Sequence, residues 1–182
     1  MLTAPTLPLW LRAGNNFLGA LHPLGFQRHS LSKARLLDEA RKKTGLEDFG
    51  DPGFEEGLDR LLDSLKTEAQ LTALGRVIAR EEILTPLVNR LHLIDHHKRY
   101  PDIGQADIAA PIFIIGMGRS GTTVLHELLA LDPQFRVTQT WEVDYPFPPP
   151  ETASYQSDPR IADVQKRLSR TDVVLPDFKR IH

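Results

Sequence analysis

One short run of residues in this sequence has both the types and the spacing that bind phosphate. It extends from Gly116 to Thr123 and reads GMGRSGTT. Glycines allow backbone N–H groups to approach an anion closely, and hydroxyl groups and a cation add further contacts. The apolar residues Ile112–Ile115 ahead of it are typical of a strand buried on both faces, and a helical pattern begins at Val124. Strand, glycine-rich loop and helix together predict a phosphate-binding site.

The run differs from the loop of nucleoside triphosphatases in the position of its cation. That loop reads G-x-x-x-x-G-K-[ST], and its lysine neutralises the β- and γ-phosphates. Here Gly116 and Gly121 have the right separation, but Thr122 stands where the lysine belongs, and the cation is Arg119. The missing lysine counts against a triphosphate ligand. It favours a compact anion, such as one phosphate that carries a further acidic group.

With the apolar run before it, the loop resembles the 5′-phosphosulfate loop of sulfotransferases that use 3′-phosphoadenosine-5′-phosphosulfate (PAPS). A loop of this kind with arginine as its cation is similar to the loop of tyrosylprotein sulfotransferases and to that of a broad bacterial group with a helical N-terminal extension. Weaker similarity continues through Leu131–Pro133 and Trp141–Glu142 to the proline run, and Asp48–Asp51 resembles the extension of the bacterial group. The resemblance implies a sulfotransferase that moves a sulfuryl group from PAPS to a hydroxyl or amine of a small-molecule or carbohydrate acceptor.

The resemblance also implies a role for the residues of the loop. Arg119 would stabilise the bridging oxygen, which gains negative charge as the bond to sulfur breaks. No metal is expected, because the leaving group is a single phosphate on the positive end of a helix. The residues implied in donor binding are Gly118, Arg119, Ser120, Gly121, Thr122 and Thr123.

Two residues are candidates for the general base that takes the proton of the acceptor. Glu142 follows a second apolar segment, about where tyrosylprotein sulfotransferases have a catalytic glutamate, although the offset differs by a couple of residues. His182 lies 63 residues after Arg119, a separation similar to that of the catalytic histidine in cytosolic sulfotransferases. It is also the last residue, and terminal residues are often frayed. Both candidates therefore stay open.

Residues 1–107 are expected to form a helical N-terminal region. Capping residues, glycine stops and Asp-Pro pairs mark the ends of its helices and of a later one. These signals are a start at Ser32 and a stop at Gly45, starts at Asp51-Pro52 and Asp158-Pro159, a capping box at Thr67 and Gln70, and a kink or break at Pro86.

Residues 108–182 are expected to begin an α/β domain, so the fold class is a P-loop-type parallel sheet preceded by the helical region. Each strand–helix–strand unit takes roughly 30 residues. Only 67 residues follow Ile115, and they contain one further weak strand candidate and a proline-rich connector. The sequence therefore predicts an incomplete sheet, in a fragment that lacks the site for the 3′-phosphate of PAPS.

Composition sets the remaining expectations. The chain has 182 residues, of which 41% are hydrophobic and 25% charged, and its net charge is −2. That is typical of a globular protein, with no overall field to recruit nucleic acid. There is no cysteine, and so neither a disulfide nor a thiolate metal site. The N-terminus has no signal-peptide pattern and no apolar run long enough to span a membrane, which predicts a cytoplasmic protein of undetermined oligomeric state.

Two other functions compete with the sulfotransferase. The first is a P-loop kinase or triphosphatase, but no apolar strand that ends in aspartate follows the loop to hold magnesium. The second is a non-catalytic helical interaction module with a vestigial loop. Nucleotide binding discriminates among the three functions. A sulfotransferase binds PAP (the desulfated donor product), a kinase or triphosphatase binds ATP with magnesium, and an interaction module binds neither.

Overall fold

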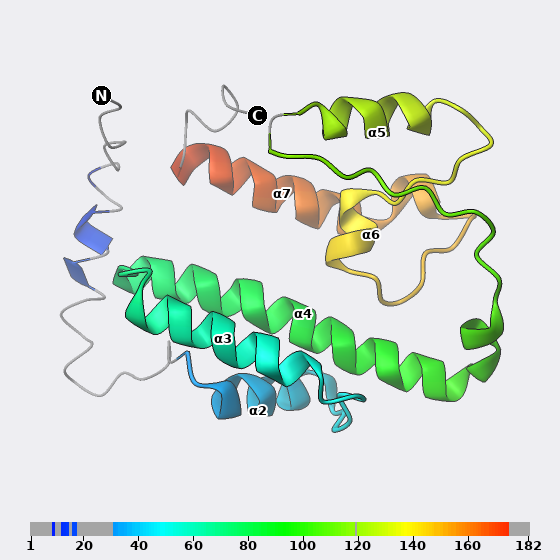
Figure 1. Ribbon diagram of the computed structural model, residues 1–182. Coiled ribbons are helices and arrows are strands. Elements are labelled where there is room, and N and C mark those ends of the chain that lie inside the picture. Colours follow the sequence, from blue (N-terminus) through cyan, green and yellow to red (C-terminus); the bar gives the residue numbers. More distant parts are fainter. Residues whose placement is uncertain (1–8, 10–11, 15, 18–30, 119, 175–182) are drawn as a thin grey trace.

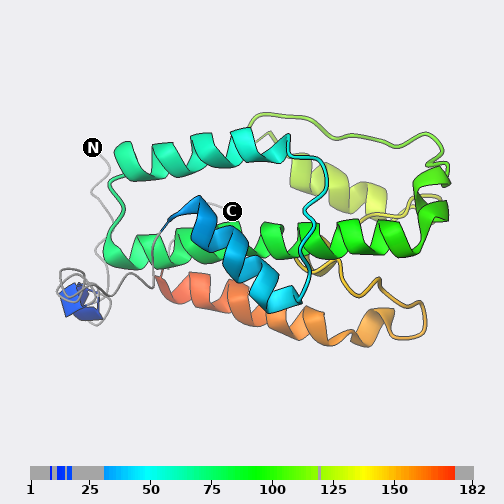
Figure 2. The ribbon, with the colours of Figure 1, turned by 90° about the horizontal axis from the view of Figure 1, so that it is seen from below.

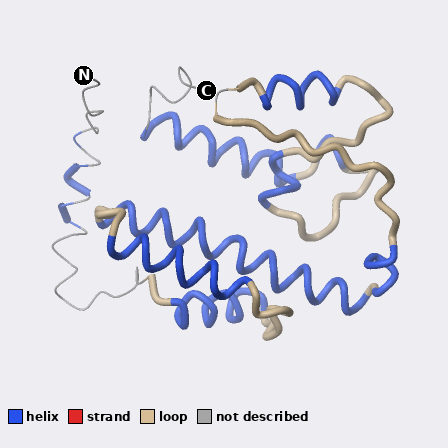
Figure 3. Tube along the Cα trace, in the orientation of Figure 1, coloured by secondary structure: helices blue, strands red, loops and turns tan. Residues whose placement is uncertain are grey.

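The structure is a computed structural model that describes residues 9, 12–14, 16–17, 31–118 and 120–174, with side chains as far as residue 169. Its helices form two groups, joined by a long loop (Figures 1 and 3). In chain order they are α2 (Lys33–Thr44), α3 (Phe54–Thr67), α4 (Ala73–Arg99), the 3-10 helix η3 (Pro101–Gln105), α5 (Thr122–Ala130), α6 (Thr140–Asp144), the 3-10 helix η4 (Tyr155–Ser157) and α7 (Pro159–Val174).

Helices α2, α3 and α4 share one hydrophobic core. α3 runs alongside the much longer α4, and α2 crosses α4 obliquely (Figures 1 and 2). The most deeply buried large side chains come from all three helices: Leu36, Leu62, Leu84 and Leu91. Fully burying a leucine contributes about 1.5–3 kcal/mol. This core therefore makes α4 the scaffold on which the first group is assembled.

The turn between α2 and α3 is anchored on α4. Gly50 has a φ of 72°, in the left-handed region that favours glycine. A Cβ added at Gly50 would lie 2.6 Å from the Ile94 side chain of α4. Arg90, also on α4, donates hydrogen bonds to the carbonyl oxygens of Phe49 and Asp51, each at 2.7 Å. The segment that resembles the bacterial helical extension is thus held against α4 by hydrogen bonds and close packing.

Several of the expected helix signals are confirmed. α2 begins directly after Ser32 and is followed by Gly45, whose φ is 70°. α7 begins at Pro159. The capping box expected at Thr67 and Gln70 is wrong: Thr67 ends α3, and the N-cap of α4 is Thr72, whose hydroxyl accepts the Gly75 N–H at 3.1 Å.

Of the two outcomes expected at Pro86, a kink or a break, the break does not occur, because α4 is one helix of 27 residues. Proline has no N–H, so it cannot donate to the carbonyl four residues earlier, at a cost of about 3 kcal/mol or more. Buried residues flank it on both sides: Ile83 and Leu84 before it, Leu87 after it. Their packing against the core offsets the lost hydrogen bond, and the helix continues.

The strand expected at Ile112–Ile115 is absent. These residues are loop, and no strand occurs anywhere in the part of the chain that the structure describes (Figure 3). The side chains of Ile112, Phe113 and Ile115 are exposed to solvent, with Phe113 at 79% and Ile115 at 92%, whereas Ile114 is half-buried. A strand exists only when its backbone pairs with a neighbour. None of the described segments offers that pairing, so the apolar run lacks the sheet that its sequence predicts.

The shared core predicts that α2–α4 depend on Leu84. Leu84 is 1% exposed, and Leu84→Ala should lower the free energy of unfolding by about 2–5 kcal/mol through lost burial and a residual cavity. The matched control is Leu93→Ala on the same helix, where the side chain is 44% exposed and the loss should stay below about 1 kcal/mol. Denaturant unfolding followed by circular dichroism measures both. Equal losses would contradict the assignment of the core.

Candidate functional site

The glycine-rich loop leads directly into the N-terminus of α5 (Figure 1). Gly121 takes a φ of 86° and precedes the first helical residue, Thr122. A turn ahead of it is closed by the N–H of Ser120, which donates to the carbonyl of Met117 at 3.2 Å. The backbone N–H groups of the first helical turn have no partner within the helix. The loop therefore presents donors and the positive end of a helix dipole, which is the arrangement that binds anions.

Gly116 is required at the start of the loop for a steric reason. A Cβ there would lie 2.4 Å from Oγ of Ser120 and 2.8 Å from Cγ2 of Thr122. The loop thus folds back on itself, with two of its hydroxyl-bearing residues against its own first glycine. Arg119 lies outside the described residues. Ser120, Gly121 and Thr123 are exposed to solvent and Thr122 is half-buried, so the described part of the loop is open to a ligand.

Glu142, the first candidate base, is buried and bonded on both oxygens. It lies on α6 and is 8% exposed. Oε2 accepts the Gln139 N–H at 2.7 Å, completing a capping box, and the Tyr155 hydroxyl at 2.8 Å. Oε1 pairs with the guanidinium of Arg136. The sequence motif gave no sign of these partners, because Tyr155 lies 13 residues further along the chain.

These contacts fix the charge of Glu142. Burial by itself raises the pKa of this carboxyl, but hydrogen bonds from the Gln139 backbone, Tyr155 and Arg136 together outweigh it and lower the pKa below its ordinary 4.5. Burial, and then the bond to Glu142, raise the pKa of the Tyr155 hydroxyl. The carboxylate is therefore ionised at neutral pH and is a weaker base than a free glutamate.

Trp141, next to Glu142, is a core residue of the second helical group. It is 6% exposed, and its ring centre lies 5.3 Å from that of Tyr155. The guanidinium of Arg160 lies 4.7 Å from the tryptophan ring centre and donates to the carbonyls of Tyr145 and Pro148 at 2.7 and 2.6 Å. Arg160 thereby fastens the proline connector to α6 and the start of α7. Sequence reasoning missed this arginine.

The printed partners of Glu142 come from the segment before α6 and from η4, and none of these described residues belongs to the glycine-rich loop. His182, the second candidate base, lies outside the described residues, as does Arg119. His126 lies on α5 and is half-buried.

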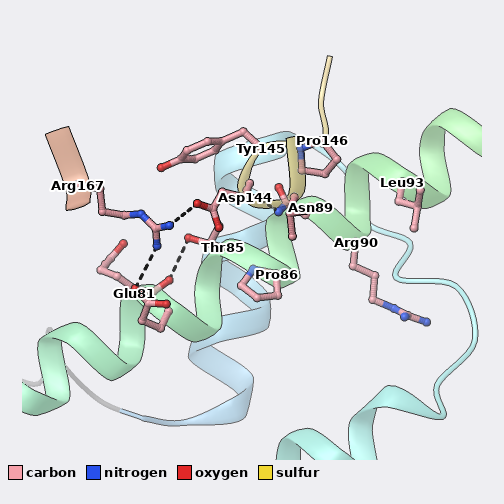
Figure 4. Close-up of a pocket in the computed structure, with 12 residues that line it drawn as sticks. Glu81, Thr85, Pro86, Asn89, Arg90, Leu93, Asp144, Tyr145, Pro146 and Arg167 are labelled. Atoms are coloured by element: carbon pink, nitrogen blue, oxygen red, sulfur yellow. Dashed lines mark hydrogen bonds and ion pairs between the residues drawn. The ribbon is translucent and has the colours of Figure 1, made fainter. Parts of the chain in front are cut away.

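A separate cleft lies between α4, the end of α6 and α7 (Figure 4). Its volume is about 740 Å³. Its charged groups bind one another: Arg167 pairs with Asp144 and, at 3.7 Å, with Glu82. Asn89 donates to the Asp144 carbonyl at 2.9 Å. No residue of the glycine-rich loop is among the residues that line the cleft.

Two further observations concern only the described residues. No group of three or more histidine, aspartate or glutamate side chains among them is placed to hold a metal ion. None of the helices described is both long enough and apolar enough to cross a membrane.

Comparison with known proteins supports the resemblance to sulfotransferases. Residues 111–180 match the family model described as the sulfotransferase family. This match supports a member of the sulfotransferase family. Sulfotransferase STF1 from Mycobacterium tuberculosis is similar at 34% identity over 80% of this chain, with a TM-score of 0.68. Sulfotransferase STF9 from Mycobacterium avium is similar at 28% identity over 79% of it, with a TM-score of 0.69. No curated protein matches the chain.

The structural likeness extends beyond the family segment but stops well short of the relatives' full length. A match over 80% of the chain exceeds the length of residues 111–180, so it includes part of the N-terminal helices. The chain spans 40% of STF1 and 37% of STF9. Both relatives thus contain a large portion that has no counterpart here.

The network around Glu142 predicts a pH-dependent contribution to stability. Because its pKa is lowered by folding, Glu142 stabilises the fold above its unfolded pKa and loses that contribution as the pH falls through the folded pKa. Glu142→Gln should therefore lower the free energy of unfolding by about 1–3 kcal/mol at pH 7. The difference from the unaltered chain should shrink as the pH falls below 4.5. Urea unfolding at several pH values measures this.

The control for that series is Glu151→Gln, a carboxylate that is exposed to solvent. It should change stability by no more than about 0.5 kcal/mol at any pH. A Glu142→Gln deficit that stays constant from pH 7 to pH 3 would show that the charge of Glu142 is not its source.

Proposed function

We propose that the chain takes part in sulfuryl transfer from PAPS to a hydroxyl or amine of a small-molecule or carbohydrate acceptor. One observation carries this proposal: a glycine-rich loop of the right pattern opens α5 within the segment that matches the sulfotransferase family. Family membership supplies the reaction class, and the loop supplies an anion site of suitable size. PAPS enters as the donor substrate, and no metal is invoked.

In this proposal the loop binds the donor and Arg119 assists departure of the leaving group. The N–H groups and hydroxyls from Gly118 to Thr123 hold the 5′-phosphate at the positive end of α5. The bond between sulfur and the bridging oxygen breaks as the acceptor oxygen or nitrogen attacks sulfur, and the electron pair stays on the phosphate. A guanidinium beside that oxygen stabilises the transition state more than the ground state, which accelerates the step.

The acceptor's proton requires a base, and Glu142 and His182 remain the candidates. The surroundings of Glu142 favour a positioning role over that of a base. Three hydrogen bonds already occupy most of the roughly four lone-pair sites of the Glu142 carboxylate, and its pKa is lowered, so it is a weak proton acceptor. Loss of Tyr155 or Arg136 as a partner would make Glu142 a stronger base.

Calorimetric titration of the chain with PAP and with ATP tests the function directly. We expect PAP to bind more tightly than ATP, with no effect of magnesium, because the loop lacks the lysine that neutralises a triphosphate. ATP binding that exceeds PAP binding and requires magnesium would indicate a kinase or triphosphatase. Absence of binding by either nucleotide would leave a non-catalytic interaction module.

Arg119→Ala should weaken PAPS binding by roughly 30- to 150-fold, equivalent to the loss of about 2–3 kcal/mol for one charge-assisted bidentate contact. The matched control is Arg60→Ala on α3, an arginine with a side chain 80% exposed that pairs only with Glu56 in the same helix. It should leave PAPS affinity unchanged. Unchanged affinity in Arg119→Ala, measured by the same titration, would remove Arg119 from donor binding.

A further inference from the structure

Two histidines near the C-terminal end of α4 lie on the same face of that helix. His92 and His96 are four residues apart, and side chains at this spacing are neighbours on a helix surface, with Cβ atoms about 5–6 Å apart. Both are half-buried. His97 comes directly after them but points in another direction, because a helix completes a turn in about 3.6 residues, and it is exposed. His92 and His96 are therefore a pair to which His97 does not belong.

The ring of Phe147 contacts both imidazoles of this pair. Phe147 lies in the loop after α6, which comes down onto the C-terminal half of α4 (Figure 1). Its ring centre is 5.8 Å from that of His92 and 5.3 Å from that of His96. No described residue forms a hydrogen bond or ion pair with the ring nitrogens of either histidine. The two imidazoles thus project to one side of α4, with nitrogens that the described part of the chain does not occupy.

A histidine pair at this spacing has the chemistry of a transition-metal chelate. Imidazole nitrogen is a ligand that Zn²⁺, Cu²⁺ and Ni²⁺ accept, whereas Mg²⁺ and Ca²⁺ prefer oxygen. In the zinc-binding motif H-E-x-x-H, two histidines four residues apart on one helix face bind the metal, and the glutamate is the general base. The run from His92 to His96 reads HLIDH, which keeps the two histidines and lacks the glutamate. The pair therefore offers metal binding without the base of a metalloprotease.

The surroundings of the pair also suit a cation. His96 lies in the last turn of α4, where the carbonyl ends of the helix carry partial negative charge. The neighbouring positive side chains are neutralised, since Arg99 pairs with Asp95 at 2.9 Å and Lys98 pairs with Asp48. A hollow of about 340 Å³ adjoins His96, so water molecules have room to complete the coordination of a bound ion. Local electrostatics thus do not oppose a divalent ion at this position.

We propose that His92 and His96 form a binding site for a divalent transition-metal ion, with Cu²⁺, Ni²⁺ and Zn²⁺ as the class of ligand. One nitrogen of each imidazole binds the ion, and water takes the remaining positions. The described residues gather no third histidine, aspartate or glutamate at a metal site, so the site has two ligands from this part of the chain. Its affinity should follow the general order for nitrogen ligands, with Cu²⁺ bound most tightly. The site is separate from the proposed sulfuryl transfer, for which no metal is invoked.

Calorimetric titration of the untagged chain with Cu²⁺, and separately with Mg²⁺, tests the proposal. We expect one equivalent of Cu²⁺ to bind and Mg²⁺ not to bind. His92→Gln and His96→Gln should each weaken Cu²⁺ binding at least about 10-fold, because losing a direct ligand costs no less than losing a group that only orients one. The matched control, His97→Gln, should leave the affinity unchanged. Glutamine is a good helix former, and circular dichroism of each metal-free variant should match that of the unaltered chain.

Paramagnetic broadening in nuclear magnetic resonance spectra of the unaltered chain locates the ion without any substitution. Substoichiometric Cu²⁺ should broaden the signals of His92, His96 and Phe147 first, because the Phe147 ring touches both imidazoles. Ile78 lies on the same helix about 21 Å before His92 and should be affected last. The proposal is overturned if Cu²⁺ does not bind, if His97→Gln weakens binding as much as His92→Gln, or if the broadening centres on other residues.

Discussion

The hydrogen bond from Asn89 to the carbonyl of Asp144 joins the two helical groups across α4. One face of α4 buries Leu84 and Leu91 against α2 and α3, and the opposite side receives the end of α6 and the side of α7. This double use is available only if α4 remains a single helix through Pro86. A break there would separate the turn anchored by Arg90 from the core beneath it. The position of everything after residue 111 therefore depends on the continuity of α4.

Buried charge organises the second group in the way that buried leucine organises the first. Glu142 and Asp158 are both 8% exposed, and each is matched by an arginine and by backbone or hydroxyl donors. Removing one partner of such a pair leaves an uncompensated charge, which costs more than the pair contributes. The three hydrogen bonds that make Glu142 an anchor for Tyr155 also make it a poor proton acceptor, because they stabilise its ionised form. Anchoring and base catalysis are thus in competition at this one carboxylate.

The sequence predicted the features that local chemistry determines. Ser32, Gly45 and Pro159 act through their own backbone conformation, and the helix after the loop begins where glycine gives way to Thr122. The helix does not break at Pro86 because the local cost of the proline is offset by packing with α2 and α3, which lie far away in sequence. The strand at Ile112–Ile115 failed for the converse reason: its local pattern is right, but strand formation needs a distant partner. The hydrogen bonds of Glu142 to Tyr155 and Arg136 could not be predicted from the sequence either, because they depend on how the chain brings η4 back to α6.

Exposure of the glycine-rich loop also limits what it can do by itself. An ion pair at 4 Å is worth about 1 kcal/mol in bulk water and several times more where water is excluded. Preorganised donors accelerate a reaction chiefly because they act in such a site. Ser120 and Thr123 are exposed to solvent in the described structure. The interaction energy of their contacts with a phosphate would therefore be close to the low value found in bulk water.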